Sequence, residues 1–235
     1  MIKLEGTHNT RDLGGMVTLD NTITKHKVFL RSDNTHKITK KDVDILKNQY
    51  NLTTVLDFRF VHESESDEDR LSKIEGINYY NLPFVTSAEV VARMMNGTLP
   101  IYEVYKKMIE SKDLVRQVFE IFGSNKIGCT LFHCSLGKDR TGIISMLLLK
   151  LANVSEEDII ENYAVSYDLI RELPEIKTLV AQYGESIFIS TRDTMEITIK
   201  YIKQKYTNFM NYFVACGINN TVLEGIKSRF LQNKI

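Results

Sequence analysis

Residues 132–142 read Phe-His-Cys-Ser-Leu-Gly-Lys-Asp-Arg-Thr-Gly, and we interpret the rest of the chain from this stretch. The short apolar run 127–132 before them suits a strand that is covered on both faces. The apolar run 141–150 after them is too short to cross a bilayer and predicts a central helix. A strand, a tight loop and a helix N-terminus direct several backbone N–H groups and the positive end of the helix dipole at one point. The stretch therefore predicts a phosphate-binding loop.

A cysteine and an arginine stand at the two ends of this loop. Helix N-termini and nearby cations favour the thiolate, so we predict that Cys134 is a nucleophile. The planar guanidinium of Arg140 matches two phosphoryl oxygens and stabilises their charge in the transition state. Gly137 lets the loop turn without a Cβ clash, and Thr141 is expected to hydrogen-bond Cys134. The predicted substrate-binding set is Ser135, Leu136, Gly137, Lys138 and Thr141.

The motif His-Cys-x-x-Gly-Lys-Asp-Arg-Thr-Gly over residues 133–142 resembles the signature of the protein tyrosine phosphatase superfamily. Its Gly-Lys-Asp-Arg-Thr-Gly ending is similar to the microbial branch whose members also act on phosphoinositides. Residues 9–15, Asn-x-Arg-Asp-x-Gly-Gly, and the Arg-Ser at 31–32 resemble the same branch, so the resemblance spans nearly the full length. It implies the tyrosine phosphatase fold and phosphate-ester chemistry at a cysteine.

Composition sets limits on the class of protein. The chain has 235 residues, of which 43% are hydrophobic, so a single phosphatase domain over residues 1–235 is expected. Lysine plus arginine and aspartate plus glutamate number 30 each, so the net charge favours neither nucleic acid nor an anionic membrane as a partner. Three cysteines form neither a disulfide framework nor a metal-binding spacing, and we expect no metal and no cofactor.

The N-terminus lacks the apolar core of a signal peptide, and no later segment is apolar for long enough to span a membrane. We therefore expect a cytoplasmic monomer without integral membrane association, with export by a route that needs no cleaved signal left open.

Alternating strand and helix patterns predict an α/β fold with a central, mostly parallel sheet of four to five strands and helices on both faces. Residues 52–59 and 77–84 read as strands, and residues 16–30 as a hairpin around residues 20–21. Capping boxes are predicted at residues 39–42 and 155–158. The remaining segments, 88–122 and 174–231, read as helices, the second with breaks near Gly184, Ser190 and Gly217.

Charged residues follow several predicted strands and belong near the loop, because the carboxyl ends of parallel strands line the ligand crevice. Asp57 and Arg59 come directly after one strand; they either pair with each other or with Arg11, or Asp57 takes part in catalysis. Arg11, Asp12 and Arg31 are predicted to form a salt-bridge lattice that braces the loop. The acidic run 62–69 reads as a solvated helix face.

Phosphoryl transfer to a thiolate needs a group that protonates the leaving oxygen. Many cysteine phosphatases carry this acid on a loop after a strand, but residues 83–87 contain no carboxylate. Asp139 inside the loop is the first candidate, as the resemblance also implies, and Asp57 is the second. Asp139 has an alternative role in capping loop N–H groups or pairing with a basic residue.

Two neighbours of the nucleophile complete the predicted site. Lys138 adds a cation that suits a second phosphate, as in a phosphoinositide; the alternative is a solvent-facing lysine. His133 is expected to orient the loop by hydrogen bonding rather than to act as a base.

The predicted activity is metal-free hydrolysis of phosphate monoesters through a phosphocysteine, with inorganic phosphate as product. Its substrates would be phosphotyrosine or phosphoserine/threonine proteins, phosphoinositides, or both. The alternatives are a catalytically weak phosphate-ester binding module and a rhodanese-like or arsenate-reductase-like enzyme.

Overall fold

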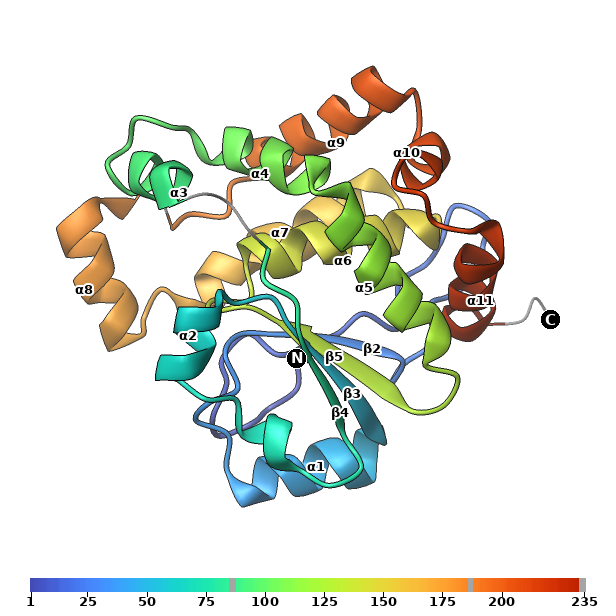
Figure 1. Cartoon of the computed structure of the whole chain (residues 1–235), viewed down its shortest axis with the longest axis horizontal. Coiled ribbons are helices and arrows are strands. Elements are labelled where there is room, and N and C mark those ends of the chain that lie inside the picture. Colours follow the sequence, from blue (N-terminus) through green and yellow to red (C-terminus); the bar gives the residue numbers. More distant parts are fainter. Residues whose placement is uncertain (85–87, 186–187, 233–235) are drawn as a thin grey trace.

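The computed structural model describes residues 1–84, 88–185 and 188–232, and a five-stranded sheet lies at its centre (Figure 1). The strand order is β1-β2-β5-β3-β4, with β1 antiparallel to β2 and the other neighbours parallel. The strands are β1 Arg11–Asp12, β2 Phe29–Ser32, β3 Leu52–Asp57, β4 Asn78–Asn81 and β5 Cys129–His133. The predicted mostly parallel sheet of four to five strands is therefore confirmed.

Strand register brings the functional segments to one edge of the sheet. All five residues of β5 are buried, as expected for a central parallel strand. Its last residue, His133, lies beside Ser32 of β2 and Asp57 of β3. The three strands run in parallel and end at the same level, so the segments that follow them leave the sheet side by side.

Helices cover both faces of the sheet, as predicted (Figure 1). Phe29, Leu56 and Phe132 belong to the large core beneath the helices of the second half of the chain. Leu131 belongs to the smaller core on the α1 side, as the alternation of strand side chains requires. The helices are α1 Lys40–Tyr50, α2 Val61–Ser66, the 3-10 helix η1 Arg70–Lys73, α3 Ala88–Met95, α4 Ile101–Glu110, α5 Lys112–Ser124, α6 Asp139–Leu151, α7 Glu156–Ile170, α8 Pro174–Tyr183, α9 Arg192–Tyr206, α10 Phe209–Ala215 and α11 Asn220–Phe230.

The two predicted capping boxes have different outcomes. At α1, the Asp42 N–H donates to Thr39 Oγ1 (3.2 Å) and the Thr39 N–H donates to the Asp42 carboxylate (2.9 Å), so this box is confirmed. At α7, Ser155 caps the helix by accepting from the Asp158 N–H, 3.1 Å away. The Asp158 carboxylate bonds the Ser155 hydroxyl instead of its backbone N–H. The second motif is thus an N-cap without the reciprocal bond.

The remaining local predictions are largely confirmed. Within residues 16–30, Val17 forms an antiparallel bridge with Ile23 across the predicted hairpin, while Thr18 and Thr24 form antiparallel bridges with Val154 and Leu231. The end of the segment continues into β2 of the sheet. The C-terminal helices break at the predicted points and also at Thr207, which has a φ of 70°. Residues 85–87 of the segment that lacks a carboxylate lie outside the described residues. None of the described helices combines the length and apolarity that crossing a membrane requires.

Candidate active site

The loop between β5 and α6 has its carbonyl groups held by other parts of the protein. The carbonyl oxygens of Ser135, Leu136 and Gly137 each accept one hydrogen bond. The donors, in the same order, are the Asn34 N–H (3.1 Å), Asn9 Nδ2 (2.8 Å) and Arg31 Nη2 (2.7 Å). Three consecutive carbonyls are therefore fixed by donors outside the loop.

Five N–H groups at the loop and the start of α6 have no acceptor among the described residues. Within the described part of the chain, no oxygen accepts from the N–H groups of Ser135, Leu136, Gly137, Asp139 or Arg140. They precede or begin α6, whose dipole places partial positive charge at the same point. Consecutive donors without acceptors at a helix N-terminus have the geometry of an anion-binding loop, and the binding of phosphate there stays a prediction.

Gly137 is required by the geometry of this loop. Its φ is +66°, a conformation that side-chain-bearing residues rarely adopt. A Cβ at this position would lie 2.6 Å from the Ser32 carbonyl oxygen. The loop can therefore approach the end of β2 this closely only with glycine at residue 137.

Cys134 lies at the base of the loop and is 2% exposed. Two arginines act on it electrostatically, Arg31 from β2 and Arg140 from α6. Burial lowers the pKa of Arg31 to about 10, against an opposing effect from Cys134. Burial also acts to lower the pKa of Arg140, but Cys134 and Glu63 outweigh it and the pKa is raised. A thiolate at this position is flanked by two guanidinium groups.

Glu63 of α2 holds Arg140 in place. Its carboxylate lies 2.7 and 3.2 Å from the two terminal nitrogens of Arg140, and Ser135 Oγ bonds both residues. Burial alone would raise the pKa of Glu63, but its hydrogen bonds and ion pair with Arg140 lower it to about 2. The prediction that residues 62–69 form a solvated helix face is wrong at this residue. Its position shortly after β3, at the sheet edge that gathers the site, is the signal that identifies it.

His133 is completely buried beneath the loop and contacts an oxygen on each side. Its Nε2 lies 2.8 Å from Asp69 Oδ2 and its Nδ1 lies 3.3 Å from the Cys134 carbonyl oxygen. Burial acts to lower the pKa of His133, but Asp57 and Asp69 outweigh it and raise it. The predicted hydrogen bonding of His133 to the loop is confirmed, and Asp69, 1% exposed, is a second exception to the solvated acidic run.

Asp57 and Arg59 pair with each other, as one of the predicted alternatives states. Arg59 Nη2 lies 2.7 Å from Asp57 Oδ2, and the Tyr79 hydroxyl donates to the same oxygen at 2.7 Å. Both members of the pair are buried, and the pKa of Asp57, which burial alone would raise, is lowered to about 2 by His133 and Arg59. An inaccessible, ionised carboxylate is poorly suited to donate a proton. Asp57, Asp69 and His133 approach one another as metal ligands would, but the Arg59 guanidinium would repel a cation there.

The arginines near the N-terminus brace the loop with neutral partners. Arg31 donates to Asn162 Oδ1 (2.7 Å) as well as to Gly137, and Arg11 donates to the Asn162 carbonyl oxygen (2.9 Å). Asp12 instead accepts from backbone N–H groups of the turns at residues 14 and 27. The predicted brace is confirmed, but its description as a salt-bridge lattice is wrong because α7 supplies carbonyl, amide and hydroxyl oxygens.

Lys138 and Asp139 lie together at the start of α6. Lys138 is 1% exposed, and its Nζ donates to the Phe188 carbonyl oxygen (2.9 Å) and lies 3.3 Å from Asp139 Oδ1. The alternative of a solvent-facing lysine is therefore wrong. The Asp139 side chain is 26% exposed, and the Tyr105 hydroxyl donates to its Oδ1. Tyr105 lies in the segment 88–122 that the sequence predicts as helical, and its contact with Asp139 has no signal in the sequence.

Thr141 does not make the expected hydrogen bond. Its side chain is completely buried, and its Oγ1 has no hydrogen-bond partner among the described residues, Cys134 included.

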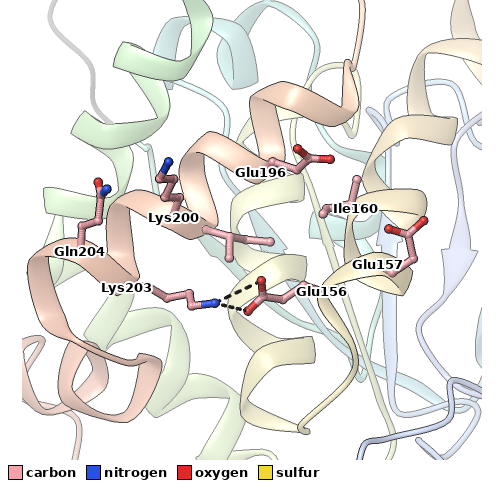
Figure 2. Close-up of a pocket in the computed structure, with 8 residues that line it drawn as sticks. Glu156, Glu157, Ile160, Glu196, Lys200, Lys203 and Gln204 are labelled. Atoms are coloured by element: carbon pink, nitrogen blue, oxygen red, sulfur yellow. Dashed lines mark hydrogen bonds and ion pairs between the residues drawn. The ribbon is translucent and has the colours of Figure 1, made fainter.

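A larger, open pocket of about 600 Å³ lies between α7 and α9 (Figure 2). Its charges compensate one another, as in the 3.1 Å ion pair between Lys203 and Glu156 drawn in Figure 2. None of its lining residues comes from the loop. A smaller cavity of about 160 Å³ borders the loop at Ser135 and Leu136, with His8 and Lys37 among its other lining residues. Of these two cavities, the smaller one adjoins the candidate active site.

Known proteins similar to this chain include two curated phosphatases. A tyrosine-protein phosphatase of Nostoc commune is 30% identical over 159 residues, which cover 66% of this chain and 54% of that protein. A putative tyrosine-protein phosphatase of Cupriavidus necator is 28% identical over 169 residues, covering 67% and 60%. The chain thus spans between half and two thirds of the length of these relatives.

Among solved structures, the catalytic core of the PP-IP phosphatase SIW14 from S. cerevisiae, in complex with citrate, is a distant likeness. Its TM-score is 0.40 and its sequence identity 18%, with 78% of this chain and 92% of that chain covered. The model of the tyrosine phosphatase family matches residues 2–232, which is nearly the whole chain and confirms the resemblance seen in the sequence. The chain belongs to the tyrosine phosphatase family.

Proposed function

We propose that this chain is a single-domain, cysteine-dependent phosphate monoester hydrolase that works through a phosphocysteine at Cys134. The observation that carries the proposal is the loop above Cys134, whose carbonyls are held by outside donors while its N–H groups have no acceptor in the described part of the protein. Arg140, fixed by Glu63, adds a planar guanidinium beside these donors. Family membership supports the same chemistry.

In the first step, the Cys134 thiolate attacks phosphorus and the bond between phosphorus and the leaving oxygen breaks. The loop N–H groups and Arg140 bind the phosphoryl oxygens as charge redistributes among them. Asp139, partly exposed at the start of α6, gives its proton to the leaving oxygen. The products of this step are the dephosphorylated alcohol or phenol and a phosphocysteine.

In the second step, water attacks the phosphorus of the phosphocysteine. Asp139, now ionised, accepts a proton from this water, and the bond between sulfur and phosphorus breaks. Inorganic phosphate leaves, and Cys134 returns to the thiolate. The chain's own residues supply the nucleophile, the acid and the cation that these two steps require.

The proposed substrates are phosphotyrosine or phosphoserine/threonine proteins, phosphoinositides, or both. The names of the curated relatives favour phosphotyrosine. A second phosphate, as in a phosphoinositide, would have to draw Lys138 Nζ from the Phe188 carbonyl oxygen, its partner in this structure. Phosphotyrosine makes no such demand on Lys138, and we place it first among the substrates.

Phosphate release tests the proposal directly. The purified protein is assayed on phosphotyrosine and phosphoserine peptides and on a set of phosphoinositides, with Cys134→Ser as the blank. We expect turnover by the wild type and less than about one hundredth of it by the variant, because serine keeps the shape but is a far weaker nucleophile.

Other results of this assay would favour one of the alternative functions, a phosphate-ester binding module or a rhodanese-like enzyme. Tight binding of phosphate esters without product would indicate a binding module, and turnover of thiosulfate in place of phosphate esters would indicate a rhodanese-like enzyme. Activity of Cys134→Ser above one hundredth of the wild type would refute Cys134 as the nucleophile.

A further inference from the structure

Two buried tyrosine hydroxyls form a chain that ends on Asp139. The Tyr105 hydroxyl of α4 bonds Asp139 Oδ1 and also lies 2.8 Å from the Tyr163 hydroxyl of α7. Tyr105 is completely buried and Tyr163 is 1% exposed. These two hydrogen bonds thus join two helices of the core, α4 and α7, to Asp139, the first residue of α6.

Chemistry decides the direction of these hydrogen bonds when Asp139 is ionised. A carboxylate only accepts, so Tyr105 donates its one hydroxyl hydrogen to Asp139. Tyr163 must then donate to the oxygen of Tyr105. Burial, followed by the charge of Asp139, raises the pKa of both tyrosines, which keeps their hydroxyl groups protonated as donors.

The two oxygens of Asp139 have different surroundings. Oδ1 receives the Tyr105 hydroxyl and lies 3.3 Å from Lys138 Nζ. No donor of the described residues bonds Oδ2. The Asp139 side chain is 26% exposed, and Oδ2 is the oxygen that these contacts leave without a donor among the described residues.

We propose that Tyr105 is a positioning residue: its hydroxyl fixes the Asp139 carboxyl through Oδ1 and leaves Oδ2 to carry the proton to the leaving oxygen. The proposal rests on the proposed role of Asp139 as general acid. The other charged or titratable groups that act on this carboxyl are Lys138 of the loop, Arg140 of α6 and Tyr163 of α7. Arg31 of β2 acts on both tyrosines.

The sign of the effect follows from the form that the hydrogen bond stabilises. Donation from Tyr105 favours the ionised carboxylate, so removing the hydroxyl makes the carboxyl hold its proton to higher pH. A general acid works only while protonated, and activity falls as pH rises through its titration. Loss of the Tyr105 hydroxyl should therefore move the alkaline limb of the pH profile, where activity falls, to higher pH. It should also slow the step that needs proton donation, because the carboxyl is no longer held.

The test is Tyr105→Phe, assayed for kcat and kcat/KM against pH with phenyl phosphate and p-nitrophenyl phosphate. We expect the alkaline limb to rise by about one pH unit, as the loss of a hydrogen bond to a charged group implies. We expect kcat to fall about tenfold for phenyl phosphate, which needs a protonated leaving group, and less than about threefold for p-nitrophenyl phosphate.

Tyr212→Phe is the matched control. Tyr212 is also completely buried, and its hydroxyl donates to the Ile109 carbonyl oxygen (2.8 Å), which lies outside the loop. This variant should lose a similar amount of stability and keep the wild-type pH profile. Tyr163→Phe, which leaves the bond between Tyr105 and Asp139 in place, should shift the limb in the same direction by less. It serves as the test if Tyr105→Phe does not fold.

A titration of the Asp139 carboxyl carbon by NMR separates this proposal from the proposed function. Its midpoint should move to higher pH in Tyr105→Phe and not in Tyr212→Phe, whether or not the protein is active. An unchanged midpoint in Tyr105→Phe would overturn the role of Tyr105. So would an equal loss of kcat with both esters together with an unchanged alkaline limb of the pH profile. If the wild type hydrolyses no phosphate ester but the midpoint shifts as expected, the proposed function is rejected. The proposed effect of Tyr105 on the Asp139 carboxyl would still stand.

Discussion

Two arginines contact the loop between β5 and α6, Arg31 from β2 and Arg140 from α6, and their own partners are of opposite kinds. Arg31 is completely buried, donates to neutral oxygens such as those of Gly137 and Asn162, and burial lowers its pKa to about 10. Arg140 is 13% exposed at its side chain and pairs with the Glu63 carboxylate. We therefore expect Arg31 to maintain the shape of the loop and Arg140 to supply the positive charge of the proposed phosphate site.

Replacing each arginine by lysine should separate these roles, and Arg140→Lys has the largest expected effect. Lysine keeps the charge but loses the planar pair of donors. We expect kcat/KM for p-nitrophenyl phosphate to fall about a thousandfold, with the free energy of unfolding reduced by about 1 kcal/mol or less. Steady-state kinetics and urea unfolding measure the two quantities.

Arg31→Lys is the counterpart, with a smaller effect on rate and a larger one on stability. It removes the donor to the buried carbonyl oxygen of Gly137 and to the partly buried Asn162 Oδ1, so the free energy of unfolding should fall by about 2 kcal/mol. Equal losses of rate and stability in both variants would contradict the division between shape and charge.

Glu63→Gln should have a smaller effect that appears in the pH dependence of stability. The pKa of Glu63 is lowered to about 2 by Arg140 against the effect of burial, from an ordinary value of 4.5. Its contribution is present above the unfolded-state pKa of 4.5 and is lost as pH falls from 4.5 towards 2. We expect the wild type to lose roughly 2–3 kcal/mol more than the variant across this range, measured by urea unfolding at stepped pH.

Asp57 provides the internal comparison for this prediction. Its pKa is also lowered to about 2, so both proteins should share the part of the acid sensitivity that comes from the pair with Arg59. Parallel stability curves for wild type and Glu63→Gln would show that the pair between Glu63 and Arg140 does not contribute.

Much of the fold could be predicted because its signals are local. The strand, loop and helix around Cys134 follow from runs of apolar residues and one glycine, and the α1 capping box from two residues three positions apart. The pairing of Asp57 with Arg59 was among the predicted alternatives for the same reason, since the two residues are close in sequence.

The parts that could not be predicted depend on contacts between distant segments. Glu63 reads as part of a solvated acidic run until Arg140, 77 positions away, is placed beside it. The sequence leaves open whether Lys138 binds a second phosphate or faces solvent, because Phe188, whose carbonyl oxygen accepts from its Nζ, lies 50 positions away. Periodicity identifies Tyr105 as a core residue but says nothing of where its hydroxyl points, because a single polar atom does not alter the apolar pattern of a helix.

The measurement that tests the account most directly is trapping of the covalent intermediate. The wild type is mixed with excess p-nitrophenyl phosphate, quenched in acid within the first turnovers, and analysed by peptide mass spectrometry. The account predicts one added phosphoryl group on the peptide that contains Cys134, and none on the same peptide of Cys134→Ser. Sustained turnover with no adduct, together with an active Cys134→Ser variant, would contradict it.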